Sequence, residues 1–232
     1  MGSVKCGEER LAPRRLPISA PMKANNVSHQ CQWCLSGILA PVPARPKVSQ
    51  SEIIAATLEL LERKGRDGFA MSEVAAAVGV RAPSLYGHFT DRATLLDEVE
   101  LSLWHDLGRI LAGQVVTNQP VETLRAQARA YRRFAKQHPN GYALLFDVRS
   151  RVSERGVRAR GEAMASTLAA LTTFVGESRA LLAARVLAPY LHGFVSMENA
   201  RAFRMGRGLD TAFEHGVETL LRGLITEAME RG

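Results

Sequence analysis

Apolar residues recur with helical spacing between residues 49 and 64, which predicts a first amphipathic helix. Ser49 followed by Glu52 has the spacing of a capping box, in which both side chains satisfy free N–H groups at a helix start. Gly65 follows the last residue of the stripe and is a typical helix end. The stripe consists of Ile53, Ile54, Thr57, Leu58, Leu60 and Leu61.

Two shorter helical blocks, joined by a glycine, follow in residues 71–92. Gly79 suits the turn between them, because glycine adopts a positive φ without a steric penalty. Pro83 suits the first turn of the second block, where its missing N–H would have no partner. Leu85 and Phe89 lie four residues apart and are expected to pack inward. This pattern predicts a helix-turn-helix, whose second helix enters the major groove of DNA.

The rest of the chain repeats helical periodicity without strand-like alternation, so the predicted fold class is all-α. Pro189 removes a backbone donor inside one predicted helix and is expected to kink it. Asp210 is expected to cap the last helix. The helices predicted after the first two cover approximately residues 82–88, 92–112, 120–137, 142–146, 157–175, 178–205 and 210–229.

Composition narrows the class of protein. The 232 residues carry a formal net charge of +7, which agrees with a nucleic-acid partner. Residues 47–92, however, carry six basic and six acidic side chains, so contacts to DNA must come from a few well-placed groups. The chain has no run of about 18 apolar residues, which predicts that it neither spans nor binds a membrane.

Residues 1–46 differ from the rest, since they contain six of the ten prolines. We expect a largely disordered extension, or a segment that results from a start codon placed too far upstream. Its three cysteines include an H-x-C-x-x-C cluster at residues 29–34, which we interpret as incidental because zinc signatures usually carry two ligand pairs. No metal or cofactor is predicted. Arg45 and Lys47 are either an arm that reaches DNA or a solvated linker.

Several separated segments resemble the tetracycline-repressor (TetR) family of bacterial transcription regulators. They are LLERKG, EVAAAVGV, SLYGHF and the DR before a leucine-rich helix, all between residues 49 and 100. YRRFAKQHPNGYALLF and the His192-Gly193 region resemble the C-terminal domain of a His-Gly-containing subgroup. Ala70 and Arg81 depart from the family, which usually has Ser or Thr caps at these positions, each worth about 1 kcal/mol.

The resemblance implies a domain organisation and three sets of site residues. Residues 47–92 would form the DNA-binding domain, and residues 93–232 a ligand-binding and dimerisation domain. The expected DNA contacts are Lys47, Arg81, Ser84, Tyr86, His88 and Arg92. The expected lining of the ligand cavity is Trp104, Phe134, Phe146, Met164, Leu168, Phe174 and Tyr190, with His192 as polar anchor. The expected dimer interface is Phe194, Phe203, Phe213, Val217, Leu220 and Leu221.

The predicted function is a cytoplasmic, ligand-responsive transcription regulator that binds a near-palindromic operator as a homodimer. Repression is the usual behaviour in the family, and activation stays open. The mostly apolar lining suggests a small apolar or aromatic effector. No phosphate-binding loop, metal-binding histidine pair or nucleophile elbow is present, so no enzyme activity is predicted. The alternative is a helical dimer that binds ligands or proteins and has weak or lost DNA affinity.

Overall fold

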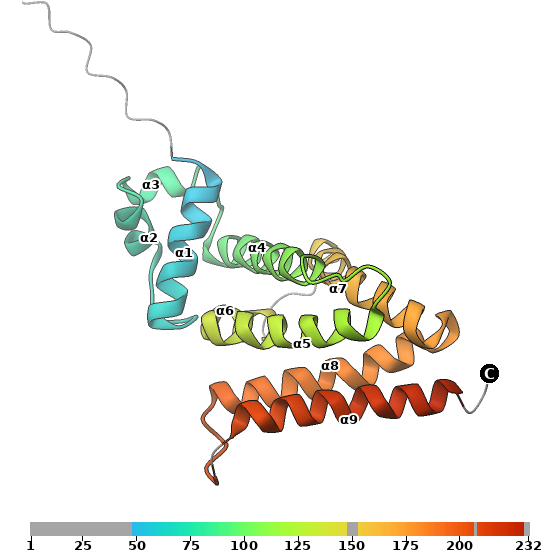
Figure 1. Cartoon of the computed structure of the whole chain (residues 1–232). Coiled ribbons are helices and arrows are strands. Elements are labelled where there is room, and N and C mark those ends of the chain that lie inside the picture. The colour runs from blue at the N-terminus through green and yellow to red at the C-terminus, as the bar shows by residue number, and fades with distance from the viewer. Residues whose placement is uncertain (1–47, 148–152, 207, 230–232) are drawn as a thin grey trace, which may run out of the picture. The chain divides into compact units, whose positions relative to one another are not determined.

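The computed structural model describes residues 48–147, 153–206 and 208–229, and all regular secondary structure within these ranges is helical (Figure 1). The all-α prediction is therefore confirmed. The segments 1–47, 148–152, 207 and 230–232 lie outside the described residues. The helices are α1 Gln50–Lys64, α2 Met71–Ala77, α3 Ala82–Leu85, α4 Arg92–Ala112, α5 Pro120–Gln137, α6 Pro139–Leu145, α7 Glu154–Val175, α8 Glu177–Asn199 and α9 Leu209–Met229.

Helices α1, α2 and α3 form a small bundle with its own core, which we call the head. Helix α4 packs against α1 and also against α5, α6 and α7, and we call α4 to α9 the body. The predicted capping box is present, because the Ser49 hydroxyl accepts from Glu52 N–H and the Glu52 carboxylate accepts from Ser49 N–H. Gly65 and Gly79 have φ values of 75° and 71°, so both turns use the backbone freedom of glycine. The buried apolar side chains of the bundle are Ile53, Leu60, Leu61, Phe69, Met71, Val74, Ala75, Leu85 and Phe89.

Several predicted helix boundaries were wrong, including the start of α7, which lies at Glu154 rather than residue 157. Helix α3 stops at Leu85 rather than residue 88, because the Leu85 carbonyl accepts from His88 and Phe89 and closes a turn. Helix α6 starts at Pro139, earlier than predicted. Helix α8 ends at residue 199, where Arg201 takes a φ of 52°. Helix α9 starts at Leu209, so residue 210 lies inside its first turn.

The crossing of α4 and α7 depends on small residues. A Cβ atom added to Gly108 would lie 2.8 Å from the Cα of Ala163, so only glycine permits this approach. The buried face of α7 accordingly contains Ala159, Ala163, Ala170, Leu171 and Val175. Val157 and Leu168 of the same helix do not belong to this face, because their side chains are 60% and 41% exposed.

Helices α8 and α9 run side by side (Figure 1). The Tyr190 hydroxyl donates to the carbonyl of Phe213 at 3.0 Å, and a Cβ at Gly216 would lie 2.0 Å from that hydroxyl. The interior of this pair contains Phe213, Val217 and Leu221, which are 1%, 3% and 0% exposed. These three predicted interface residues therefore belong to the core of their own chain, since α8 already covers them.

Basic side chains of α5 tie it to the last two helices. Arg125 pairs with Glu218 at 2.9 Å and Arg129 with Glu214 at 2.8 Å. Arg132, which is 9% exposed, pairs with Glu198 of α8 and Asp210 of α9, both at 2.7 Å. Asp210 was predicted to cap α9 and instead reaches across to α5.

Within the described residues, α8 is long and apolar enough to cross a membrane by length and composition alone. Its mean hydropathy over the best window is 1.3. The buried side of α8 packs against α5, α7 and α9. The opposite side exposes the large apolar side chains Leu182, Val186 and Met197, which we call the α8 apolar face.

Candidate functional site

Three predicted DNA-contacting residues lie on the exposed surface around α3. Arg81 and Ser84 are exposed, and the Tyr86 side chain is 54% exposed. Leu85 and Phe89 point into the core, so helical spacing turns the polar residues outward. The arrangement presents a guanidinium and two hydroxyl groups, the chemistry that contacts phosphates and base edges.

The remaining DNA-contact predictions have different outcomes. His88 is half-buried, and its ring centroid lies 6.4 Å from that of Phe89. Lys47 lies outside the described residues. Arg92 is half-buried. Its guanidinium lies over the Phe69 ring at 4.6 Å and donates to the Arg66 carbonyl, so Arg92 packs inside the head.

The N-terminus of α4, where Arg92 lies, is capped by its own chain. The Asp91 carboxylate accepts from Thr94 N–H at 2.7 Å and caps this helix. A capped N-terminus has fewer free donors for an anion, because the side chain already accepts one of them.

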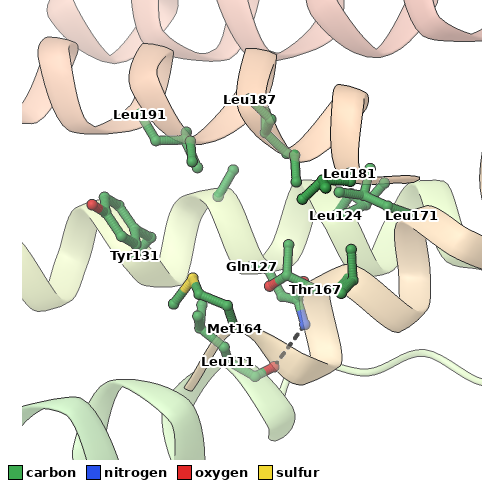
Figure 2. Close-up of a pocket in the computed structure, with 14 residues that line it drawn as sticks. Leu111, Leu124, Gln127, Tyr131, Met164, Thr167, Leu171, Leu181, Leu187 and Leu191 are labelled. Carbon is green, nitrogen blue, oxygen red and sulfur yellow. Dashed lines mark hydrogen bonds between the residues drawn. The ribbon is translucent and has the colours of Figure 1, made fainter. Parts of the chain in front are cut away.

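A cavity of about 190 Å³ lies in the body, between the end of α4 and helices α5, α7 and α8 (Figure 2). Figure 2 shows Leu187 and Leu191 of α8 directed toward α5, with Met164 of α7 on the opposite side. Within the described part of the chain, the lining has no Asp, Glu, Lys, Arg or His. It consists of Leu111, Leu124, Gln127, Ala128, Tyr131, Met164, Thr167, Leu168, Leu171, Leu181, Ala184, Leu187, Ala188 and Leu191.

Of the ligand-lining residues predicted from sequence, the cavity contains Met164 and Leu168. Trp104 is 2% exposed and packs edge-on against Phe146, whose centroid is 5.8 Å away. Phe134 is 2% exposed and packs against His138. The other predicted aromatic residues also pack against the core, Phe174 as a half-buried residue of α7 and Tyr190 against α9. Large aromatic residues at helical spacing here form core, which is their commoner use.

His192 was predicted as the polar anchor of the ligand, and the structure gives it protein partners instead. Its Nδ1 is hydrogen-bonded to the Tyr142 hydroxyl at 2.7 Å, and its ring centroid lies 4.1 Å from that of Phe146. Burial, and then the charge of Arg160, lowers the pKa of His192. The imidazole is thus held neutral as part of a packed junction.

The hydrogen bond of His192 belongs to a chain that crosses three helices. The Tyr142 hydroxyl of α6 also bonds to the Tyr131 hydroxyl of α5 at 2.8 Å. Burial raises the pKa of both tyrosines, that of Tyr142 to about 12, so both stay protonated. Since Tyr131 lines the cavity and His192 lies on α8, this chain connects the cavity wall with α6.

Helix α6 in turn contacts the head through Glu62 of α1. The Glu62 carboxylate accepts from the backbone N–H of Asn140 at 3.0 Å and of Gly141 at 2.7 Å. The Asn140 amide donates to the Glu62 carbonyl at 2.9 Å. At the other end of α6, Arg66 pairs with Asp147. Both ends of this short helix are therefore attached to α1 or to the turn that follows it.

Gln127, a polar residue in the cavity wall, was not predicted from the sequence. Its Nε2 donates to the Leu111 carbonyl and to the Ser166 hydroxyl, both at 3.1 Å. Its Oε1 is buried and has no hydrogen-bond partner among the described residues. A signal existed, because Gln127 lies three residues after Leu124 and four before Tyr131, within the apolar stripe of α5.

The described residues contain no group of three His, Cys, Asp or Glu side chains that could hold a metal ion. The histidine–cysteine cluster at residues 29–34 lies outside them. A solvent-facing recognition helix in a helix-turn-helix head, joined to a helical body with an apolar cavity, defines a ligand-responsive DNA-binding protein.

Comparison with known proteins agrees with this class. The profile for bacterial regulatory proteins of the tetR family matches residues 53–99, and that for the tetracyclin repressor-like C-terminal domain matches residues 124–220. An HTH-type transcriptional regulator of Mycobacterium tuberculosis is 30% identical over 163 residues, which cover 67% of this chain and 72% of the relative. The chain belongs to the tetR family of bacterial regulatory proteins and is a ligand-responsive, DNA-binding transcription regulator.

Solved structures share the fold. A protein of unknown function from Rhodococcus sp. RHA1 superimposes with a TM-score of 0.69 at 25% identity, covering 79% of this chain and 99% of that one. A TetR variant from Acinetobacter baumannii in complex with minocycline has a TM-score of 0.58 at 25% identity, covering 76% and 96%.

Proposed function

We propose that this regulator is a cytoplasmic, dimeric repressor that acts by binding and carries out no catalysis. Residues 47–92 would bind DNA, and residues 93–232 would bind the effector and form the dimer. The proposal depends on one observation. Arg81, Ser84 and Tyr86 of the helix-turn-helix are exposed to solvent, whereas its apolar side chains are buried in the core. Two such heads, about one helical turn of DNA apart, would occupy a near-palindromic operator.

The α8 apolar face supports the dimer. Leu182 and Val186 also line a groove between α8 and α9, together with Leu220 and Leu224 of α9. Contiguous exposed apolar residues on two neighbouring helices favour association, and a two-fold axis would bring the same face of a second copy onto it. Of the interface predicted from sequence, Phe194, Phe203 and Leu220 are half-buried and stay in the proposal.

The effector would occupy the cavity beside Met164 and Tyr131. The A. baumannii TetR variant named above was solved with minocycline, which supports a ligand site in the body of this chain as well. The DNA-binding heads would have two arrangements, one that fits the operator and one that does not. A bound effector would shift the equilibrium between them by the difference between its affinities for the two arrangements. The hydrogen-bond chain through Tyr142 and the contact of Glu62 with α6 offer a physical route for this coupling.

A gel shift and footprint on the DNA that flanks the coding region of this protein tests the proposal, comparing wild type with Tyr86→Ala. Tyr86 is 54% exposed, so the variant should fold normally. We expect a protected palindrome that Tyr86→Ala loses. Arg133→Ala, which alters an exposed cation of α5, is the matched control and should leave protection intact. A folded, dimeric wild-type protein that protects no palindrome in that DNA at low salt would contradict the proposal.

The dimer has a separate test in sedimentation velocity. Val186→Glu places a charge on the α8 apolar face and should yield monomers, whereas Thr172→Glu, on the exposed side of α7, should not. A Val186→Glu variant that stays dimeric would remove this face from the interface.

Two observations favour a second candidate, a helical dimer that binds ligands and has weak DNA affinity. Residues 47–92 carry no net charge, and Arg92 is turned inward. The salt dependence of DNA binding separates the two, because each phosphate contact contributes about −0.9 to the slope of log K against log salt. A steep slope supports the regulator with an operator, and a flat one supports the second candidate.

A further inference from the structure

The wall of the cavity contains one buried amide whose hydrogen bonding is incomplete. Gln127 is 3% exposed and lines the cavity (Figure 2). Its Oε1 lacks a hydrogen-bond partner within the described part of the chain. A buried acceptor without a donor is unfavourable. A ligand that donates a hydrogen bond to it removes this penalty and therefore binds more tightly than a ligand of the same shape without a donor.

The orientation of this amide is set by its neighbours. The Leu111 carbonyl can only accept, and it lies 3.1 Å from Nε2. Exchanging the nitrogen and oxygen would bring two acceptors together, so the nitrogen must face Leu111. The same nitrogen bonds to Ser166, which leaves Oε1 as the group that requires a donor.

The rest of the lining excludes a charged ligand. Leucine, alanine and methionine side chains make up most of the wall, and no charged side chain of the described residues reaches it. The Tyr131 hydroxyl is already bonded to Tyr142, and burial keeps it protonated by raising its pKa. A buried charge without a partner is strongly unfavourable, so the occupant should be neutral.

The size and opening of the cavity limit the occupant further. About 190 Å³ is close to the roughly 150 Å³ of a dry apolar cavity that accepts benzene. Leu168 and Leu181, which are 41% and 54% exposed, lie among the lining residues and mark the side open to solvent. A single ring or short chain would fill the space, and an alkyl substituent could extend past these leucines.

We infer that the effector is a neutral, mostly apolar molecule of about one ring that carries a hydroxyl or N–H group, as an alkylphenol does, and donates it to Gln127 Oε1. This inference rests on the proposed function, because it names the ligand class of the same body. Gln127 then selects among apolar molecules of equal size by the presence of one donor. The apolar wall selects against their ionised analogues.

Isothermal titration of the full chain with three probes of matched shape tests this inference. The probes are 4-propylphenol, propylbenzene and 4-propylbenzoate. Wild type should bind 4-propylphenol more tightly than propylbenzene, because only the phenol donates to Gln127 Oε1. It should bind 4-propylbenzoate at least about tenfold more weakly than the phenol, because the carboxylate would lose its hydration. Absence of binding by the phenol, or equal binding by the benzoate, would overturn the inference.

Two variants isolate the hydrogen bond. Gln127→Met removes the acceptor at similar volume and should lower the affinity ratio of 4-propylphenol to propylbenzene by at least about fivefold, the factor for one net hydrogen bond. Thr172→Val, which removes a hydroxyl on the exposed side of α7 outside the cavity, should leave this ratio unchanged. An unchanged ratio in Gln127→Met would overturn the role of Gln127. If that variant does not fold, the ranking of the three probes by wild type still decides.

Operator binding without any probe separates this inference from the proposed function. A protein that protects its operator but binds none of the probes keeps its function as a regulator and loses this ligand class. A protein that binds 4-propylphenol but no DNA keeps the ligand class and loses the regulator proposal.

Discussion

The carboxylate of Glu62 accepts a hydrogen bond from the backbone N–H of Gly141 at 2.7 Å, across a sequence separation of 79 residues. A second bond, from Asn140 N–H, completes the capping of α6 by a side chain of α1. A carboxylate at a helix N-terminus is favourable both as acceptor and by charge. The head and the body therefore share a hydrogen-bonded contact that belongs to neither alone.

Glu62→Ala should loosen α6 while leaving the head folded. We expect the free energy of unfolding to fall by about 1–3 kcal/mol, since two backbone donors lose a charged acceptor. Hydrogen exchange should accelerate specifically at the amides of Asn140 and Gly141. Glu59→Ala, an exposed carboxylate on the same helix, is the control and should change stability by less than about 0.5 kcal/mol. Unaltered exchange at these amides would show that Glu62 does not hold α6.

Gly141→Ala should destabilise the same contact by crowding. The added Cβ would lie 2.8 Å from Glu62 Oε1 and 3.2 Å from both δ-carbons of Leu103. We expect a loss of about 1–3 kcal/mol in urea unfolding, the usual range for overpacking. Gly161→Ala is the matched control, because its Cβ would have no neighbour within 4 Å among the described residues and alanine favours a helix. That variant should gain up to about 1 kcal/mol, and equal losses in both would contradict the argument.

Stability should fall as the pH drops below the ordinary histidine pKa of about 6.5, because of His192. The pKa of His192 is lowered in the folded protein. Below a pH of about 6.5 the unfolded chain therefore binds a proton at this histidine more readily than the folded protein does, which favours unfolding. Burial raises the pKa of Glu100, which gives the opposite sign, so wild type should be compared with His192→Gln. Unfolding curves between pH 7.5 and 5.5 should show a smaller loss of stability in the variant. Parallel curves would exclude a role for His192.

Arg92→Ala should affect the stability of the protein, whereas Arg81→Ala should affect its binding to DNA, although both residues lie near α3. Arg92 packs on Phe69 and donates to the Arg66 carbonyl, so its loss should reduce the stability of the head, seen in thermal melting. Arg81 is exposed, so its loss should leave melting unchanged. It should instead weaken operator binding and reduce the salt slope by about 1. A normal melting curve for Arg92→Ala would contradict the packing role.

Local pattern was enough to predict most of the fold. The stripe of α1, its capping box and the glycine at residue 79 were all evident in the sequence, because they depend on neighbours within a few residues. The bounds of α4, residues 92–112, were also predicted correctly. The end of α3 was less predictable, because a turn hydrogen bond decides it. The ion pair of Asp210 with Arg132 of α5 was likewise not evident from local pattern.

The sites depended on tertiary structure far more than the helices did. Periodicity could not tell that Trp104 and Phe146 face each other rather than a ligand, or that α8 covers Phe213 and Val217. Helical spacing gives the side on which a residue lies, but only packing decides whether that side meets another helix, a cavity or solvent. The contact of Glu62 with α6 and the free Oε1 of Gln127 arise from residues far apart in the chain. The sequence by itself thus determined the helices and the DNA-binding class, whereas the tertiary structure decided the cavity, its polar group and the junction between head and body.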